Sequence, residues 1–120
     1  MLPKQHRLSL RKELRRIQKK GHLIHGRYFS LLIAPRLSKG KDNSIPNYSR
    51  LAFIISKKIH QKAVKRNQIR RRLIEATRSY LPELNLGFEI VFLVKKAIVN
   101  TSFEEVSREV GILFKKAKVI

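Results

Sequence analysis

The segment from Phe88 to Val94, with the sequence FEIVFLV, is nearly all apolar and constrains the fold more than any other part of the chain. Its length is typical of a β-strand. A strand with so few polar side chains must be covered on most of both faces. The segment therefore predicts the central strand of a sheet, and the turn at Leu86-Gly87 leads into it.

Apolar residues with a period of 3.6 predict three helices, over residues 9–20, over residues 62–81 and from Ser102 onward. Ser9 and Gly21 are the expected N-cap and stop of the first helix, and Pro82 ends the second. Ser102-x-x-Glu105 is a capping box that opens the third. The apolar stripes are Leu10, Leu14 and Ile17 in the first helix; Ile69, Leu73, Ala76 and Tyr80 in the second; and Phe103, Val106, Val110, Leu113, Phe114 and Ala117 in the third.

Two more strands are expected over residues 29–34, before Pro35, and over residues 51–55, with a possible short strand within residues 23–28. Residues 36–49 are polar, contain Gly and Pro, and predict a loop. This connection favours an antiparallel hairpin between the two strands that it joins. The order of elements predicts one α/β (α+β) domain over residues 1–120, a two-layer sandwich with a single sheet.

The charge of the chain is concentrated in its first two-thirds. The whole chain has a formal net charge of +20, and residues 1–82 hold 22 of its 28 basic side chains with only three acidic ones. A small folded domain with this charge repels itself unless a polyanion binds it. Nucleic acid is the leading candidate partner, and an anionic membrane surface is the second.

Several classes of site are excluded by composition and order. The chain has no Cys, so it holds neither disulfides nor Cys-based metal centres. It has four histidines (His6, His22, His25 and His60), and no acid or third His lies close in sequence to His22 and His25 to complete a zinc site. No Ser-His-Asp order or phosphate-binding Gly-rich loop is present. No apolar run approaches the ~18 residues of a membrane span. The N-terminal segment lacks the apolar core of a signal peptide but could pass for a basic amphipathic presequence.

A one-sided basic surface is predicted for the second helix. At 100° per residue, Arg66, Asn67, Arg70 and Arg71 share one face, whereas Lys65 and Arg72 lie beyond the core stripe on the other flank. Solvated helix faces usually mix charges of both signs, but here Glu75 is the one acid among nine basic residues from position 56 to 78. Guanidinium groups suit phosphates because they donate two parallel hydrogen bonds.

These residues resemble the signature of the bacterial ribonuclease P protein component. The resemblance is carried by Ser56-Lys57-Lys58, Ala63 and Arg66-Asn67-Gln68-Ile69-Arg70-Arg71, and it is extended by Arg7-Leu8, Gly21, Phe29 and Leu113-Phe114-Lys115. It covers roughly residues 5–117. Two positions depart from the family pattern: Gln68 stands where the family usually has Arg, and Ile74 stands where it usually has Lys or Arg. Ile74 is expected to be exposed, in the middle of the basic face.

The resemblance implies a four-stranded mixed sheet with three helices and a left-handed βαβ crossover. It also implies a function: the protein subunit of ribonuclease P, an endoribonuclease that removes the 5′ leader of precursor tRNA. The chemistry would belong to the catalytic RNA subunit, with Mg²⁺ held together with that RNA, and no catalytic residue or metal ligand is expected in this chain. The implied location is cytoplasmic, with no stable protein partner and no membrane.

Two sets of RNA-contacting residues follow from the resemblance. For the catalytic RNA they are Lys57, Lys58, Lys62, Lys65, Arg66, Asn67, Gln68, Arg70 and Arg71. For the 5′ leader, in a cleft between the first helix and the sheet, they are Arg7, Arg11, Lys12, Leu14, Arg15, Gln18, Tyr28 and Phe29. Leu14 and Gln18 stand where the family commonly has Phe. Tyr28 is the better candidate for base stacking, because Phe29 also fits the core.

Other functions remain as alternatives. A stand-alone structural RNA-binding protein of the ribosomal type would carry the same charge, but it would not need this motif spacing. A DNA-binding module is disfavoured because the basic helix is flanked by strands and no helix-turn-helix pattern is present. A membrane-surface helix fits poorly with a chain that has a core and no Trp.

Overall fold

The structure is a computed structural model in which residues 2–36 and 48–120 are described. Its strands are β1 (His22–Ile24), β2 (Phe29–Pro35), β3 (Arg50–Ile54) and β4 (Phe88–Val94), and its helices are α1 (Leu10–Lys20), α2 (Ala63–Arg78) and α3 (Phe103–Lys116). Short 3₁₀ turns cover Lys4–His6, Leu81–Glu83 and Lys96–Ile98. All four strands form one mixed sheet, which confirms the predicted fold class.

β4 is a central strand, as its apolar sequence predicted. The sheet order is β1-β2-β4-β3, with β4 antiparallel to β2 and parallel to β3. The predicted hairpin between residues 29–34 and 51–55 is therefore wrong, because β4 lies between those two strands. Placing the most apolar strand there pairs both of its edges and covers both of its faces. Of the predicted loop at residues 36–49, positions 37–47 lie outside the described residues.

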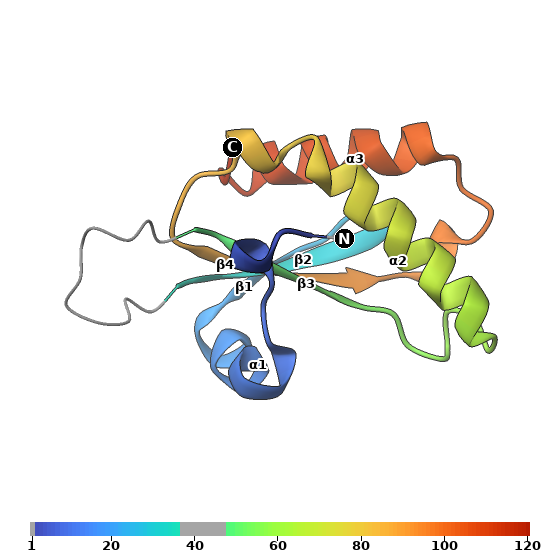
Figure 1. Cartoon of the computed structure of the whole chain (residues 1–120), viewed down its shortest axis with the longest axis horizontal. Coiled ribbons are helices and arrows are strands. Elements are labelled where there is room, and N and C mark those ends of the chain that lie inside the picture. The colour runs from blue at the N-terminus through green and yellow to red at the C-terminus, as the bar shows by residue number, and fades with distance from the viewer. Residues whose placement is uncertain (1, 37–47) are drawn as a thin grey trace.

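The helices lie on both faces of the sheet (Figure 1). On one face, Ile90 and Phe92 of β4 join a large apolar core with α2 and α3. On the other face, Val91 packs in a smaller cluster with Ile17 of α1. The predicted two-layer arrangement describes the sheet with α2 and α3, and α1 adds a partial layer beneath it. Both layers form because side chains alternate between the two faces of β4, and both sets are apolar.

Aromatic rings fill the large core around Phe92. Its ring centroid lies 5.0 Å from that of Phe29, 4.7 Å from that of Phe53 and 6.0 Å from that of Phe114. The predicted stripes of α2 and α3 face this core, except that Phe103 is 42% exposed. Phe103 lies in the first turn of α3, before the buried stretch that begins at Val106.

The predicted helix ends are largely confirmed. The Ser102 hydroxyl accepts a hydrogen bond from the backbone N–H of Glu105 (3.3 Å), which is half of the capping box. Gly21 ends α1 where the chain turns into β1. A Cβ at Gly21 would lie 2.5 Å from the carbonyl oxygen of Ile17 and 2.9 Å from that of Ile33, so only glycine allows this close approach. α2 ends earlier than predicted, at Arg78, and Pro82 lies in the following 3₁₀ turn.

The N-terminal segment covers the outer edge of β3. The Leu8 N–H donates to the carbonyl oxygen of Leu51 (3.0 Å), and Arg7 forms a parallel bridge with the same residue. One ring nitrogen of His6 lies 2.8 Å from the carbonyl oxygen of Ser49. These contacts pair an edge that would otherwise expose unsatisfied backbone groups. They also lead the chain across the sheet to α1.

Candidate RNA interface

The exposed side of α2 carries the predicted basic surface, which we call the α2 face and define as Arg66, Asn67, Arg70 and Arg71. Asn67, Arg70 and Arg71 are exposed, whereas Leu73 on the other side of the helix is fully buried. The Arg70 guanidinium donates a hydrogen bond to the Asn67 side-chain oxygen (3.4 Å). Burial of one side of the helix thus turns these cations outward.

Arg66 is also tied to the backbone before the helix. Its Nη1 donates to the carbonyl oxygens of both His60 and Gln61, each at 2.8 Å, and the side chain is half-buried. The other guanidinium N–H groups of Arg66 are not used by these two bonds and can still meet a phosphate. Arg66 therefore both holds the turn against α2 and contributes charge.

The turn before α2 holds three exposed lysines, Lys57, Lys58 and Lys62. It is anchored by Ile59, whose side chain is buried in the large core and whose N–H donates to the Ser56 carbonyl (3.0 Å). One buried apolar side chain thus fixes the turn in which these cations lie.

Two residues predicted to bind the catalytic RNA lie on the other flank of α2. Lys65 and Gln68 line a hollow together with Arg72. Arg72 donates to the backbone oxygen of Thr101 (3.3 Å), which places it away from the α2 face as the helical wheel predicted. The α2 residues that were predicted to bind the catalytic RNA therefore lie on two different flanks of the helix.

Ile74 was expected to be exposed in the middle of the basic face, and this expectation is wrong. Its side chain is half-buried and packs against the large core. The helical wheel uses an even spacing of 100°, but α2 contacts both the sheet and α3, so its buried sector is wider than one stripe. The apolar residue at position 74 is thus part of the packing.

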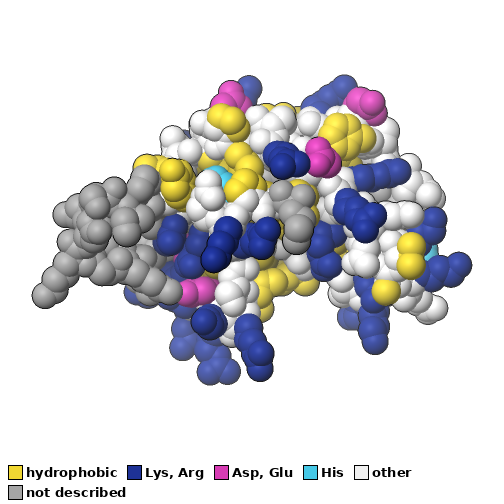
Figure 2. Space-filling view, viewed as in Figure 1, with side chains coloured by type: hydrophobic (Ala, Val, Ile, Leu, Met, Phe, Trp, Pro, Cys, Tyr) yellow, Lys and Arg dark blue, Asp and Glu magenta, His cyan; other side chains and the backbone are white. Residues whose placement is uncertain are grey.

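The second predicted surface lies on α1 and the segment before it. Its exposed side chains, which we call the α1 face, are Arg7, Arg11, Lys12, Arg15 and Gln18. Leu14 is half-buried beside them. Figure 2 shows Lys and Arg side chains gathered at the lower edge, over α1, and again at the right, around the start of α2.

α1 leaves part of its sheet face open. Three half-buried side chains, Leu32, Ile54 and Leu93, pack at the margin of the small apolar cluster there. They come from β2, β3 and β4, and register pairs Ile54 with Leu93. None of the three was among the residues predicted for this surface. The alternation of inward and outward positions along each strand was the signal that could have identified them.

Two aromatic residues predicted for the leader site are not available for stacking. Phe29 is 0% exposed in the large core. Tyr28 is 7% exposed, and Arg27 lies over its ring at 5.3 Å. Tyr28 precedes β2, so alternation along that strand does not govern where its side chain points.

The contacts of Tyr28 are with α3. Its hydroxyl donates to the Glu105 carboxylate, and its backbone N–H donates to the Glu109 carboxylate (2.6 Å). The hydrogen bond to Glu105, aided by burial, raises the pKa of Tyr28 above its usual value. Tyr28 thus fastens the start of β2 to α3, and its ring is not free to stack on a base.

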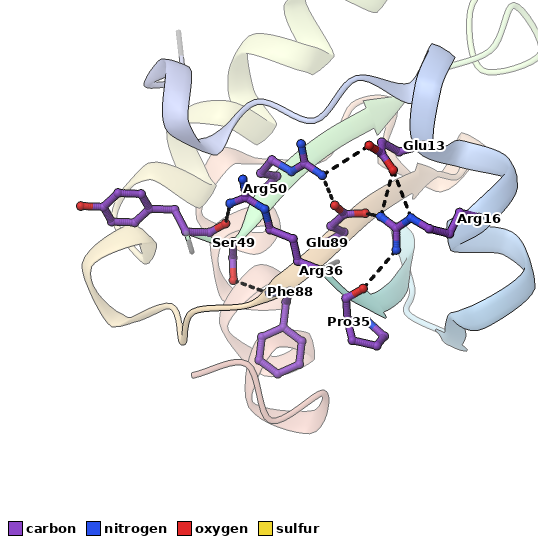
Figure 3. A network of polar contacts seen from close by, with 9 residues as sticks. Glu13, Arg16, Pro35, Arg36, Ser49, Arg50, Phe88 and Glu89 are labelled. Atoms are coloured by element: carbon purple, nitrogen blue, oxygen red, sulfur yellow. Dashed lines mark hydrogen bonds and ion pairs between the residues drawn. The ribbon is translucent and has the colours of Figure 1, made fainter. Parts of the chain in front are cut away.

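A buried polar network fastens α1 to the sheet (Figure 3). The Glu89 carboxylate on β4 is fully buried and pairs with Arg16 of α1 and Arg50 of β3. Glu13 of α1 is 3.1 Å from Arg16 and 3.7 Å from Arg50. Burial, together with the nearby charge of Arg50, lowers the pKa of Arg36 beside this network. Glu89 was not singled out from the sequence, because the strand around it is nearly all apolar.

Within residues 2–36 and 48–120, no three His, Cys, Asp or Glu side chains come together in a way that could hold a metal ion. Two histidine rings have hydrogen-bond partners in the backbone: His6 contacts the Ser49 carbonyl, and His60 accepts a hydrogen bond from the Lys62 N–H. The interface is therefore built from cations, amides and apolar side chains.

Comparison with known proteins identifies the family. The profile described as Ribonuclease P matches residues 2–118. The chain is 32% identical over its full length to the ribonuclease P protein component of a Pseudanabaena species, of which it covers 97%. It is 31% identical over 98% of its length to that of Syntrophomonas wolfei, of which it covers 91%.

Solved structures of RNase P proteins are similar to this chain. The RNase P protein from Thermotoga maritima superposes with a TM-score of 0.77 at 27% identity, over 92% of this chain and 96% of that one. The Staphylococcus aureus RNase P protein shares the fold, with a TM-score of 0.78 at 24% identity, over 95% of this chain and 96% of that one. The chain therefore belongs to the bacterial ribonuclease P protein components, the protein subunits of the endoribonuclease that processes the 5′ ends of tRNA.

Proposed function

We propose that the chain binds the catalytic RNA of ribonuclease P through the α2 face and the lysines of the preceding turn. We propose that it binds the 5′ leader of precursor tRNA through the α1 face and the adjacent side of the sheet. The observation that carries this proposal is the placement of the two basic surfaces. α1 and α2 pack on opposite faces of one sheet, so two RNA segments can bind without competing (Figure 1).

The α2 face suits a structured RNA because its charge is not neutralised by neighbours. Among the described residues, Arg70 and Arg71 have no carboxylate at ion-pair distance, and the one acid on the helix, Glu75, pairs with Arg78 (3.3 Å). Exposed cations with fixed helical spacing bind phosphates regardless of base sequence. The amide of Asn67 can add a hydrogen bond to a phosphate or a 2′-hydroxyl group.

The surface made by the α1 face and the half-buried side chains of the sheet beside it suits a single strand. The cations of the α1 face can follow its phosphates, and Leu32, Ile54 and Leu93 offer an apolar surface to its bases. This surface holds no open aromatic ring among the residues predicted for it. Stacking on aromatic rings contributes about 1–3 kcal/mol per base, so we expect leader binding to depend mainly on charge.

We assign the cleavage chemistry to the RNA subunit. Mg²⁺ prefers phosphate oxygens and water to an all-protein site, so the RNA would hold it, and the cations of this chain would reduce phosphate repulsion when the RNAs meet. We further propose that the chain acts in the cytoplasm and needs no stable protein partner. No helix in the described part of the chain is long and apolar enough to span a membrane.

Reconstitution tests this function. The purified protein alone should leave precursor tRNA intact, whereas adding the ribonuclease P RNA from the same genome should give a product with a 5′-phosphate at lower Mg²⁺ than the RNA needs alone. If about five phosphates are neutralised, log K for the RNA subunit against log salt should have a slope near −4. Site-specific cutting by the protein alone would contradict the proposal, and so would binding that salt does not weaken.

A further inference from the structure

The flank of α2 behind the α2 face borders a hollow. A hollow of about 480 Å³ lies between α2 and the connection from β4 to α3. The start of α2 and this connection lie at the right side of Figure 1. This volume falls within the range of pockets that hold small ligands, about 300–1,000 Å³. One wall comes from the flank of α2 that faces away from the α2 face.

The α2 wall of the hollow is cationic. Lys65 and Arg72 lie two helical turns apart on the same flank, and His60 comes from the turn before the helix. The His60 Nδ1 accepts a hydrogen bond from the Lys62 N–H (3.1 Å), so in the neutral ring the proton lies on Nε2, which is then a donor. No carboxylate is among the described residues that line the hollow. An anionic group can therefore enter without meeting a like charge.

The floor of the hollow is apolar. It is formed by Ile69 of α2, Ile98 of the connecting segment and Val106 of α3, and the latter two are 5% and 1% exposed. Gln68 adds a side-chain amide at the wall, with one acceptor and two donors. A flat ring with polar edges fits these surfaces better than a phosphate alone would.

The wall opposite α2 is held in place by its own hydrogen bonds. Asn100 takes a left-handed backbone conformation (φ 68°), and the Thr101 hydroxyl donates to the Ala97 carbonyl (2.9 Å). Arg72 bridges the hollow to the Thr101 backbone oxygen. A wall that is already ordered costs less conformational entropy when a ligand binds.

We propose that this hollow binds one unstacked nucleotide of the RNA partner, with its base on Ile69, Ile98 and Val106 and its phosphate on Lys65 and Arg72. This inference rests on the proposed RNA-binding function and adds a site to it. Unpaired bases that turn out of the RNA are the usual targets of proteins that recognise RNA by more than its charge. Gln68 then contacts the edge of the base.

A titration of the full-length protein with AMP tests the site directly. The backbone amide resonances of Thr101 and Ser102 should shift saturably in NMR spectra, and inorganic phosphate at the same ionic strength should shift them much less. If phosphate has the same effect as AMP, the hollow is a simple anion site and the proposal fails. It also fails if AMP shifts only amides near Asn67, Arg70 and Arg71.

Paired variants separate this site from the proposed function. Lys65→Ala/Arg72→Ala should weaken binding of the ribonuclease P RNA roughly tenfold or more, since two phosphate contacts are lost. The control, Lys115→Ala/Lys116→Ala, removes the same charge from exposed positions at the end of α3 and should cost less than twofold. Circular dichroism checks that each variant folds.

The RNA affinities of these variants distinguish a failure of the nucleotide site from a failure of the proposed function. If Arg70→Ala/Arg71→Ala weakens RNA binding while Lys65→Ala/Arg72→Ala behaves like the α3 control, the nucleotide site is wrong and the proposed function stands. If neither variant differs from the control, the proposed use of α2 fails as a whole. Equal losses for all three pairs would mean that the effect is general electrostatics, which also overturns the nucleotide site.

Discussion

Arg16 of α1 and Glu89 of β4 form an ion pair that joins positions 73 residues apart in the sequence, and the Glu89 side chain is fully buried. Arg16 also donates to the Pro35 carbonyl at the end of β2 (3.1 Å). Together with the buried Ile17, this pair fixes where α1 lies on the sheet. It therefore sets the position of the α1 face in the proposed leader site.

Removing the Glu89 carboxylate should destabilise the protein strongly. Glu89→Ala leaves Glu13 as the remaining carboxylate beside the partly buried Arg16 and Arg50, and breaking a buried pair from one side costs up to about 3–5 kcal/mol. Thermal unfolding followed by circular dichroism measures the loss, with the exposed Glu83→Ala as control. Similar melting temperatures for the two variants would show that the network contributes little to stability.

Ile74→Arg should lower stability without strengthening RNA binding. The Ile74 side chain packs against the large core, and its burial is worth part of the ~1.5–3 kcal/mol of a fully buried Ile. Val64→Arg is the matched control on the same helix, because Val64 is 67% exposed. The melting temperatures of the two variants and their RNA affinities at several salt concentrations test this prediction. Tighter binding with an unchanged melting temperature would place Ile74 on the RNA-facing surface after all.

The α2 face should account for a measurable part of the salt dependence of RNA binding. Arg70→Ala/Arg71→Ala removes two exposed cations, so the slope of log K against log salt should become shallower by about 1.4–1.8. Filter binding with the ribonuclease P RNA at several salt concentrations measures it. A lower affinity with an unchanged slope would mean that these side chains do not contact phosphates.

Tyr28 should make stability fall at high pH. Its pKa is raised in the folded state by the hydrogen bond to Glu105, so the folded protein holds the proton more tightly than the unfolded chain. This contribution is fully present below the ordinary tyrosine pKa of about 10 and is lost as pH rises through the raised value.

Absorbance at 295 nm reports this titration. One tyrosine should ionise later than the others, and Tyr28→Phe should remove that late phase. Glu105→Gln should bring it back toward the ordinary pKa, because the hydrogen bond to a charged carboxylate is lost. A late phase that persists in Tyr28→Phe would assign it to Tyr48 or Tyr80 instead.

Local features were predicted well because they depend on near neighbours. The stop at Gly21, the Ser102 cap and the outward turn of Arg70 and Arg71 each follow from a few adjacent residues. The exposed cationic side of α2 was likewise readable from helical spacing. Ile74 was wrongly predicted to be exposed, because a helical wheel with an even spacing of 100° does not show how wide the contact of α2 with α3 and the sheet is.

Features that depend on distant residues were not predicted. The predicted antiparallel hairpin of β2 and β3 was wrong because β4, which follows α2 in the chain, lies between these two strands in the sheet. Tyr28 was predicted to stack on bases because Phe29 also fits the core, and its partners on α3, 77 and 81 residues away, could not be read from the sequence. Glu89 reads as a minor interruption of an apolar strand until α1 and β3 bring their arginines to it.

The sequence by itself determined that this chain is strongly basic and has an apolar central strand, a one-sided cationic helix and the motif of its family. Those properties are set by composition and by the periods of helix and strand. The tertiary structure alone decided which strands pair, which aromatic rings stay buried and which flank of α2 forms a hollow. These outcomes depend on contacts between residues far apart in the chain, where burial and pairing of distant groups outweigh local preference.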